Sequence, residues 1–172
     1  MSSLNETEAM DAAAATGELT HLDSQGLPRM VDVSAKAETL REAEAEAVLW
    51  VGAAVMSKIR SGDTPKGNIF ETARIAGIMG AKRTSDLIPL CHPLRLTHAS
   101  VDMEVLDDRI VIRSKVKTCG NTGVEMEALT AASITGLTLY DMLKALSKEM
   151  RLDGLRLLAK SGGRSGQYRA KE

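Results

Sequence analysis

The chain has 172 residues, of which 44% are hydrophobic and 26% charged, as is ordinary for one globular domain with a sizeable core. Its net charge of -1 and its 2% of aromatic residues argue against a nucleic-acid partner, because they supply neither a positive field nor stacking surfaces. With two cysteines, no apolar run of membrane-spanning length and no signal-peptide pattern, the sequence predicts a protein of the reducing cytoplasm.

The first half of the chain mixes extended and helical patterns. Residues 1–18 are small and acidic and predict a disordered leader. Residues 30–34 alternate, which indicates a short strand or an extended arm. Residues 41–51 have the Ala and Glu content of a helix, but the two types alternate strictly, which favours a strand. Helices are predicted over 53–60 and, with a face of small residues, over 66–82.

The second half contains a hairpin, a long helix and a last strand. Residues 101–105 and 110–116 alternate on either side of a turn at 107–108, which predicts the hairpin. A buried stripe of Leu, Ile and Ala at helical spacing runs through residues 124–150. Residues 155–159 predict the final strand.

This β-α-α-β-β-α-β order predicts an α+β fold of the ferredoxin-like kind, an antiparallel sheet with helices packed on one face. We expect residues 19–172 to form this single catalytic domain, with a flexible C-terminal tail from Gly162 onward. If the uncovered sheet face is apolar, it favours association of subunits.

One histidine stands out because prolines hold the backbone beside it. In the run Asp86–Leu94, Pro89 and Pro93 bracket His92, and neither proline can continue a helix or a central strand. An imidazole held there can donate, accept or shuttle a proton near neutral pH. A core histidine on a kinked loop is the structural alternative.

Two glutamates open the long helix. Thr122 and Glu125 have the spacing of a capping box, and acidic residues suit the positive end of a helix dipole, so both acids have a structural explanation. Glu125 and Glu127 lie roughly 200° apart around an ideal helix. They can face one ligand only if the first turn is irregular.

Basic residues form three further candidates. Lys66 stands at the turn into a helix, where free N–H groups also attract anions. Asp141 and Lys144 are three residues apart and share one helical face. Lys160 and Arg164 flank two glycines that would let backbone amides point at an anion. The structural alternatives are a solvated lysine, a surface ion pair and a flexible tail.

We predict no metal site. The soft ligands in one region are Cys91, His92, His98 and Cys119, and their spacing matches no standard zinc pattern.

Taken together, these motifs resemble the cyclic pyranopterin monophosphate synthase family, also called the molybdenum cofactor biosynthesis protein C family. The resemblance covers nearly everything from about residue 20 onward, and the histidine loop combined with the Gly-Val-Glu-Met-Glu segment is its most specific part. The matching stretches are MVDVSAKAET at 30–39, KGNIFETARIAGIMGAKRTSDLIPLCHPL at 66–94, TGVEMEALTAASITGLTLYDMLKA at 122–145 and RLLAKSGGRSG at 156–166.

The resemblance implies a lyase that rearranges (8S)-3',8-cyclo-7,8-dihydroguanosine 5'-triphosphate to cyclic pyranopterin monophosphate and releases pyrophosphate. We expect no required cofactor, although Mg²⁺ can accompany the triphosphate. It implies acid–base roles for Asp141, Lys66 and Lys144, with His92 also in the catalytic set. The substrate contacts that it implies fall on Leu90, Cys91, His92, Glu125, Met126, Glu127 and Lys160, and we add Arg164 for its charge. One departure is Asn121, where many members carry a basic residue.

A distance argument predicts sites shared between subunits. Glu127 and Asp141 are fourteen residues apart on one predicted helix, hence about 21 Å along its axis, too far to touch one compact nucleotide. Opposite ends of two subunits' helices would bring them together, in agreement with the hexamers, built as trimers of dimers, that the resemblance implies.

Two other functions remain open on the residues alone. The first is a non-catalytic nucleotide-binding regulatory module, in which the acids cap a helix and His92 belongs to the core. The second is an unrelated phosphate-ester hydrolase, which would ordinarily need a metal cage rich in carboxylates.

Overall fold

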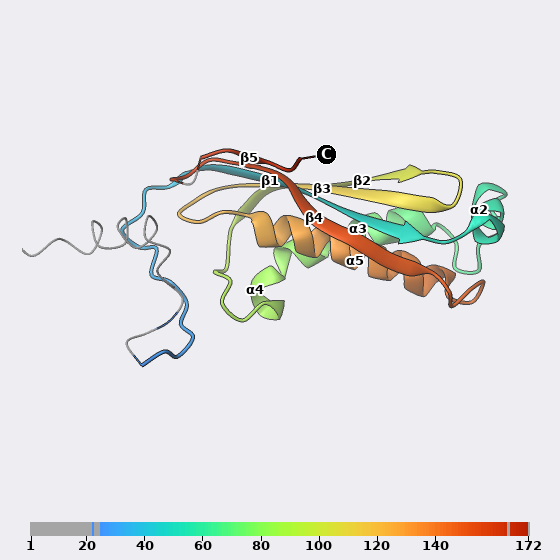
Figure 1. The fold of residues 1–172 in the computed structure, drawn as a ribbon, viewed down its shortest axis with the longest axis horizontal. Coiled ribbons are helices and arrows are strands. Elements are labelled where there is room, and N and C mark those ends of the chain that lie inside the picture. The colour runs from blue at the N-terminus through green and yellow to red at the C-terminus, as the bar shows by residue number, and fades with distance from the viewer. Residues whose placement is uncertain (1–21, 23–24, 165, 172) are drawn as a thin grey trace, which may run out of the picture.

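A twisted antiparallel sheet carries helices on one face, with one long helix running beneath it (Figure 1). The computed structural model describes residues 22, 25–164 and 166–171, so the predicted leader lies outside the described residues. The elements are β1 (Thr39–Trp50), α2 (Ala53–Arg60), α3 (Ile69–Lys82), α4 (Thr84–Leu87), β2 (Leu96–Val105), β3 (Arg109–Gly120), α5 (Glu125–Leu143), β4 (Arg151–Ser161) and β5 (Tyr168–Arg169).

The five strands lie in the order β2-β3-β1-β4-β5, and every neighbouring pair is antiparallel. β1 pairs with β3 over its full length, from Thr39 opposite Gly120 to Trp50 opposite Arg109. Each helical connection therefore crosses a strand contributed by the other half of the chain. The α+β class is confirmed, and the ferredoxin-like name remains a prediction with which this strand order agrees.

The central strand β1 confirms the choice of strand over helix for residues 41–51. Its alanines and Leu49 are fully buried against the helices, and its glutamates point to the other face. Pairing along both edges outweighs the helix propensity of Ala and Glu, because the β3 ladder spans all of β1 and the β4 ladder, with two register shifts, covers residues 42–50.

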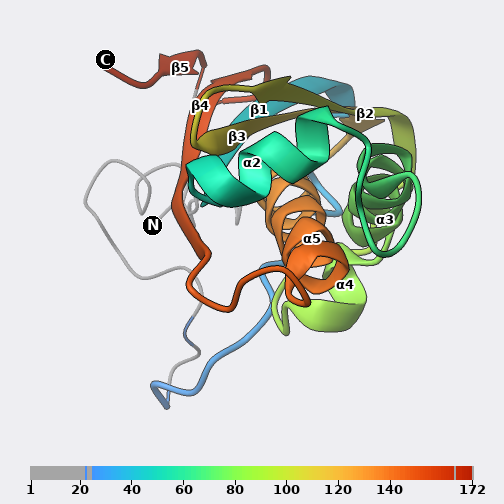
Figure 2. The same cartoon turned by 90° about the vertical axis from the view of Figure 1, so that its right-hand side faces the viewer.

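Helices α3 and α5 lie side by side under the sheet (Figure 2). The predicted face of small residues on α3 makes this contact possible: a Cβ added at Gly77 would overlap Oγ1 of Thr135 and lie 2.9 Å from the carbonyl oxygen of Ala131. Gly136 of α5 has the same function toward Leu152 of β4, since a Cβ there would overlap the leucine side chain. Glycines at these positions set the spacing of the layers.

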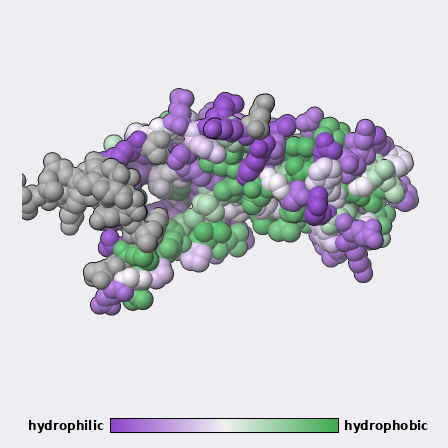
Figure 3. All heavy atoms as spheres, in the orientation of Figure 1, coloured by the Kyte–Doolittle hydropathy of each residue, from purple (hydrophilic) through white to green (hydrophobic). Residues whose placement is uncertain are grey.

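The uncovered sheet face is charged, so it does not meet the condition under which it would favour association of subunits. Lys115 of β3 pairs with Glu42 and Glu44 of β1, and Arg113 pairs with Glu46 at 3.1 Å. Hydrophilic groups accordingly cover the sheet side, while hydrophobic groups reach the surface below it (Figure 3). The exposed large apolar side chains on or beside the helical layer include Ile75, Met79, Leu87 and Leu137.

Several boundaries differ from the predicted ones. Of the two alternatives predicted for residues 30–34, the strand is absent and the extended arm is confirmed. We use 'the arm' for residues 31–36, which turn where the amide of Lys36 donates to the carbonyl of Val33. α5 ends at Leu143 rather than at residue 150. The tail predicted as flexible contains β5, which pairs with Ala159 and Lys160, and α4 was not predicted. Each of these depends on contacts outside the local pattern.

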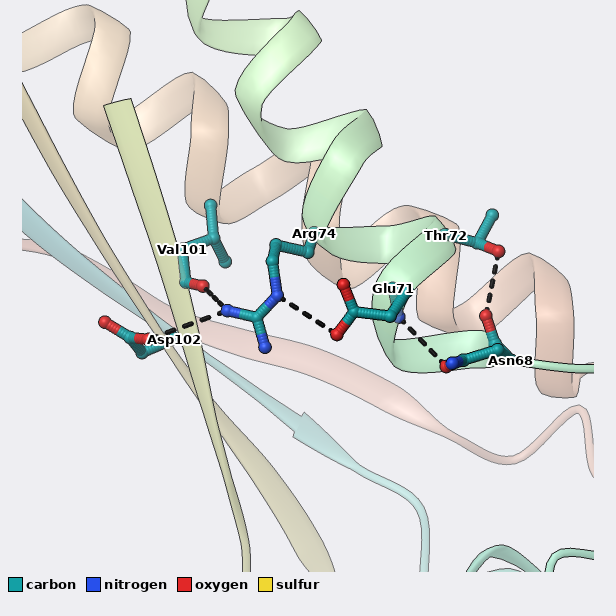
Figure 4. Close-up of polar contacts among 6 residues, drawn as sticks. All are labelled: Asn68, Glu71, Thr72, Arg74, Val101 and Asp102. Carbon is teal, nitrogen blue, oxygen red and sulfur yellow. Dashed lines mark hydrogen bonds and ion pairs between the residues drawn. The ribbon is translucent and has the colours of Figure 1, made fainter. Parts of the chain in front are cut away.

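Helix α3 begins at Ile69, later than predicted, because Asn68 caps it. The Asn68 side chain accepts a hydrogen bond from the amide of Glu71 at 3.1 Å (Figure 4). Arg74 then ties the helix to the edge strand β2, where it donates to the carbonyl of Val101 and lies near Asp102. The residues just before the cap, including Lys66, are thereby held at a fixed end of the helical layer. In the part of the chain that the structure describes, no helix has both the length and the apolar character to cross a bilayer.

Gly77→Ala tests the close contact of the two helices. We expect this variant to lose about 1–3 kcal/mol of unfolding free energy, because the added methyl group must push α3 away from a backbone carbonyl of α5. Urea denaturation measures the loss. Gly120→Ala is the matched control, since its Cβ would meet nothing closer than 3.7 Å. Equal stability of the Gly77 variant and the wild type would contradict this account of the packing.

Candidate active site

The predicted site residues gather at two ends of one helix. Glu125 and Glu127 lie in the first turn of α5, and Asp141 and Lys144 lie at its end. The helix is continuous from Glu125 to Leu143, so about 21 Å of axial rise separates Glu127 from Asp141 within one chain. We call these the N-terminal cluster (Leu90, Cys91, His92, Glu125, Met126, Glu127) and the C-terminal cluster (Lys66, Asp141, Lys144).

His92 of the N-terminal cluster is anchored to the arm. Its Nε2 lies 2.7 Å from the carbonyl oxygen of Val31. A carbonyl can only accept, so Nε2 must carry the hydrogen, and in the neutral ring Nδ1 is left as the acceptor. The prolines on either side fix the loop from which the ring reaches across. The structural alternative of a core histidine does not hold, because the ring is only half-buried and lines a cavity.

A cavity of about 260 Å³ brings together all six residues of the N-terminal cluster. Both glutamates line it, although they lie far apart around an ideal helix. This is possible because the Glu125 carboxylate folds back over Gly123, where any Cβ would overlap it. Glycine is thus the residue that fits at position 123.

The predicted capping box is wrong. The N-cap position of α5 is Val124, and no side chain caps the helix. The Glu125 carboxylate instead accepts a hydrogen bond from Lys160 at 2.9 Å. The ion pair joins residues thirty-five positions apart, and local sequence patterns carry no information about it.

Glu127 is the buried acid of the site. Only 4% of its surface is exposed, and this burial raises its pKa to about 7, with a smaller contribution from the nearby Glu125. Burial also raises the pKa of the adjacent Cys91 thiol, which the Glu127 charge raises further. Near neutral pH, Glu127 can therefore either give or take a proton.

A larger cavity of about 690 Å³ adjoins the first and shares Glu125 with it. Lys160, Arg164 and the two glycines of the last loop line it. Gly162 and Gly163 both have positive φ, and a Cβ on Gly163 would overlap the guanidinium of Arg41. The glycines thus let this loop close over β1 and form one wall of the cleft.

Arg41 is a candidate site residue that the sequence analysis missed. It lines the larger cavity, and its Nε is buried without a hydrogen-bond partner. Its Nη2 reaches only the carbonyl of Asn121, at 3.5 Å, and it makes none of the ion pairs found among the described residues. A half-buried guanidinium that pairs with no carboxylate suits an anionic ligand. The alternation of β1 could have identified it, because Arg41 lies two residues before the buried Ala43 and therefore on the same, core-facing side of the strand.

The C-terminal cluster is an ion triad. Lys66 Nζ lies 2.7 Å from one carboxylate oxygen of Asp141, and Lys144 Nζ lies 2.7 Å from the other. The pair predicted between Asp141 and Lys144 is confirmed. Hydrogen bonds from Lys144, which has the larger effect, and from Lys66 lower the pKa of Asp141 to about 2. Asp141 in turn raises the pKa of Lys144. Asp141 is therefore a weak proton acceptor while both lysines contact it.

Backbone geometry places Lys66. Gly67 has a φ of 72°, and its carbonyl accepts a hydrogen bond from Thr64 at 2.8 Å, so Lys66 sits in a tight turn before the Asn68 cap. Among the described residues, no three His, Cys, Asp or Glu side chains gather in a way that could hold a metal ion.

Comparison with known proteins assigns the chain. The MoaC family model matches residues 30–163, which include every residue of both clusters, the arm and Lys160. The chain belongs to the MoaC family. Arg164 lies one position beyond the matched range.

Relatives in this family match nearly the whole chain. A protein of Roseiflexus sp. (strain RS-1), named cyclic pyranopterin monophosphate synthase, is 54% identical over 153 residues, which cover 88% of this chain and 97% of the relative. A protein of the same name from Roseiflexus castenholzii (strain DSM 13941 / HLO8) is 53% identical over 152 residues, covering 87% and 96%. The chain thus covers almost the whole length of both relatives.

Glu127→Gln tests the buried carboxyl through folding stability. The raised pKa means that the folded protein holds a proton that the unfolded chain, with an ordinary pKa of 4.5, has already released. Stability contributed at position 127 is therefore highest below about pH 4.5 and is lost as the pH rises to about 7. The uncharged amide removes this loss.

We expect the Glu127→Gln variant to be more stable than the wild type by about 2–3 kcal/mol at pH 8, with the difference shrinking toward pH 5. Urea denaturation at both pH values measures it. Glu149→Gln, at an exposed position, is the control and should show no such dependence. A difference that is the same at both pH values would show that Glu127 has an ordinary pKa.

Proposed function

We propose that this chain is a lyase that converts (8S)-3',8-cyclo-7,8-dihydroguanosine 5'-triphosphate to cyclic pyranopterin monophosphate, with release of pyrophosphate, in molybdenum cofactor biosynthesis. The names of the two relatives, which match almost end to end, support this reaction. One observation carries this proposal. The larger cavity, lined by cationic side chains, adjoins the smaller cavity, which contains Glu127 with a pKa of about 7.

The cleft suits the triphosphate. A triphosphate carries about four negative charges, and charge-assisted hydrogen bonds from Arg41, Lys160 and Arg164 would compensate them. Any magnesium would enter bound to these phosphates, and we propose no resident cofactor. The ring system would then occupy the smaller cavity, against Leu90 and Met126.

The chemistry needs protons moved to nitrogen and from hydroxyls. One ring of the purine-derived part opens and another closes, and His92 and Glu127 are placed for the transfers on the ring side. A hydroxyl then attacks the α-phosphorus, the bond to the bridging oxygen breaks, and pyrophosphate leaves with that electron pair. We propose Asp141 as the base for that hydroxyl, and Lys66 or Lys144 as the acid, with cations stabilising the developing charge.

Both ends of α5 can serve one substrate only if two protomers share a site. We propose a homo-oligomer, a hexamer built as a trimer of dimers, in which the C-terminal cluster of one protomer meets the N-terminal cluster of its partner. The separation of about 21 Å within one chain supports this arrangement. The exposed apolar side chains of the helical layer, including Ile75, Met79 and Leu137, supply surface for such contacts. We place the enzyme in the cytoplasm.

The regulatory alternative is not favoured. A module that only binds a nucleotide gains nothing from burying an acid until its pKa reaches about 7, whereas proton transfer needs such a group. The hydrolase alternative lacks support for a similar reason, since the phosphates would meet cations rather than a cage of carboxylates.

Turnover of the cyclised nucleotide tests the proposed function. We expect purified protein to release one pyrophosphate for each pyranopterin formed, and Lys66→Gln to lower kcat/KM by at least about a hundredfold, as loss of a proton donor does. An enzyme-coupled pyrophosphate assay with chromatography of the product measures both. Lys58→Gln, on α2, is the control and should retain wild-type activity. A Lys66→Gln variant with full turnover would remove Lys66 from the mechanism.

Mixing two inactive variants tests the shared site. Glu127→Ala disables one cluster and Asp141→Ala the other, so each homogeneous variant should be inactive. Co-refolded in equal amounts, the two chains should recover about a quarter of wild-type activity, because random pairing leaves that fraction of sites with both groups intact. Activity is read by pyrophosphate release. A mixture as inactive as its parents, with subunit exchange shown by mass spectrometry, would place each site within one chain.

A further inference from the structure

The arm, residues 31–36, lies between the two cavities of the N-terminal end. Val31 and Lys36 line both of them. The arm belongs to no strand and has its own turn, in which the amide of Ser34 donates to the Asp32 side chain at 2.9 Å. It is thus a separate piece of chain resting where the phosphate cleft meets the ring pocket.

Two side chains from the body of the fold hold the arm by its backbone. His92 donates to the carbonyl of Val31, and the side-chain Nδ2 of Asn121 donates to the carbonyl of Val33 at 3.1 Å. His92 comes from the proline-bound loop, and Asn121 from the connection between β3 and α5. Because two different parts of the fold hydrogen-bond to it, the backbone between Val31 and Val33 has little freedom to shift.

Asn121 also contacts the cleft. Its own carbonyl accepts from Arg41 at 3.5 Å, so one residue connects the arm to the unpaired guanidinium. A neutral amide contributes no charge to phosphate binding, and one of its two N–H donors is already used on the Val33 carbonyl. Asn121 is therefore suited to hold the arm rather than to bind an anion.

Holding the arm in place also fixes the position of Lys36 beside the two cavities. Lys36 is exposed, lines both cavities and makes none of the ion pairs found among the described residues. The turn closed by the Lys36 amide and the Val33 carbonyl joins the lysine to the same carbonyl that Asn121 grips. Any movement of Val33 therefore moves Lys36.

We propose that Asn121 is a positioning residue that holds residues 31–36 across the cleft, so that the Lys36 ammonium meets the polyphosphate group of the substrate. The identity of that group rests on the proposed function, whereas the anchoring of the arm does not. Asn121 acts through Lys36 and has no part in the proton transfers.

Hydrogen exchange in the substrate-free protein tests the anchoring. Asn121→Ala removes the donor, and we expect the amides of residues 33–37 to exchange about threefold to tenfold faster, as loss of one hydrogen bond allows. The amides of β1 should keep their wild-type rates. Asn68→Asp is the matched control for the arm: the α3 cap needs only an acceptor, which Asp supplies. Unchanged exchange in the arm of Asn121→Ala would overturn the proposal.

Binding of inorganic tripolyphosphate, measured by calorimetry, tests the coupling to Lys36. We expect Lys36→Gln and Asn121→Ala each to weaken binding about threefold to tenfold, and the double variant to be no weaker than Lys36→Gln alone. Lys58→Gln should bind as the wild type does. Additive losses in the double variant would overturn the proposal, because Asn121 would then act independently of Lys36.

Turnover separates this proposal from the proposed function. If the cyclised nucleotide is a substrate, Asn121→Ala should raise KM about threefold to tenfold and leave kcat within about twofold, since only a binding contact is displaced. A fall in kcat at unchanged KM would overturn the positioning role. If the wild type does not turn the nucleotide over, the proposed function fails, while exchange and tripolyphosphate binding still decide the role of Asn121.

Discussion

Pairing of β1 along both of its edges is the constraint on which the rest of the structure depends. Because β3 and β4 hydrogen-bond to the two sides of β1, its side chains are divided strictly between a helix face and an open face. The alanines on the helix face let α5 pack close to the sheet. Near the N-terminus of α5, the next side chain of β1 on this same face is Arg41, which lines the cleft instead of joining the core. One periodic pattern thus builds both the core and one wall of the site.

Local patterns predicted most of the fold but only part of the site. The strict alternation of Ala and Glu identified β1, and the turn at 107–108 identified the hairpin, because both depend on neighbours in sequence. The predicted capping box is wrong because Glu125 binds Lys160 instead. The position of the arm could not be predicted, because His92 and Asn121 hold it through hydrogen bonds to its backbone. Such contacts join distant segments, and no periodicity encodes them. The cluster residues were proposed from their chemical types and from the family resemblance, not from position in space.

The unbroken length of α5 has a consequence for how the proposed site is assembled. A kink would have let one chain bring Glu127 and Asp141 together, but the helix holds ten buried residues against the sheet and α3. Bending it would expose that surface, at a loss of about 0.8 kcal/mol for each CH₂ group returned to water. Sharing the site between protomers avoids this loss, since it uses two straight helices. The packing of the core therefore favours assembly as the route to a complete site.

The two acids at the ends of α5 show how environment assigns different roles to the same chemical group. Burial raises the pKa of Glu127 to about 7, whereas two lysines lower that of the exposed Asp141 to about 2. Glu127 is ready for proton exchange before any ligand arrives. Asp141 is not, because its lysines stabilise the carboxylate. In the proposed reaction, the phosphates of the substrate would compete for Lys66 and Lys144, and each lysine drawn away would raise the proton affinity of Asp141. The substrate itself would thus turn the ion triad into an acid–base pair, which confines that chemistry to the occupied site.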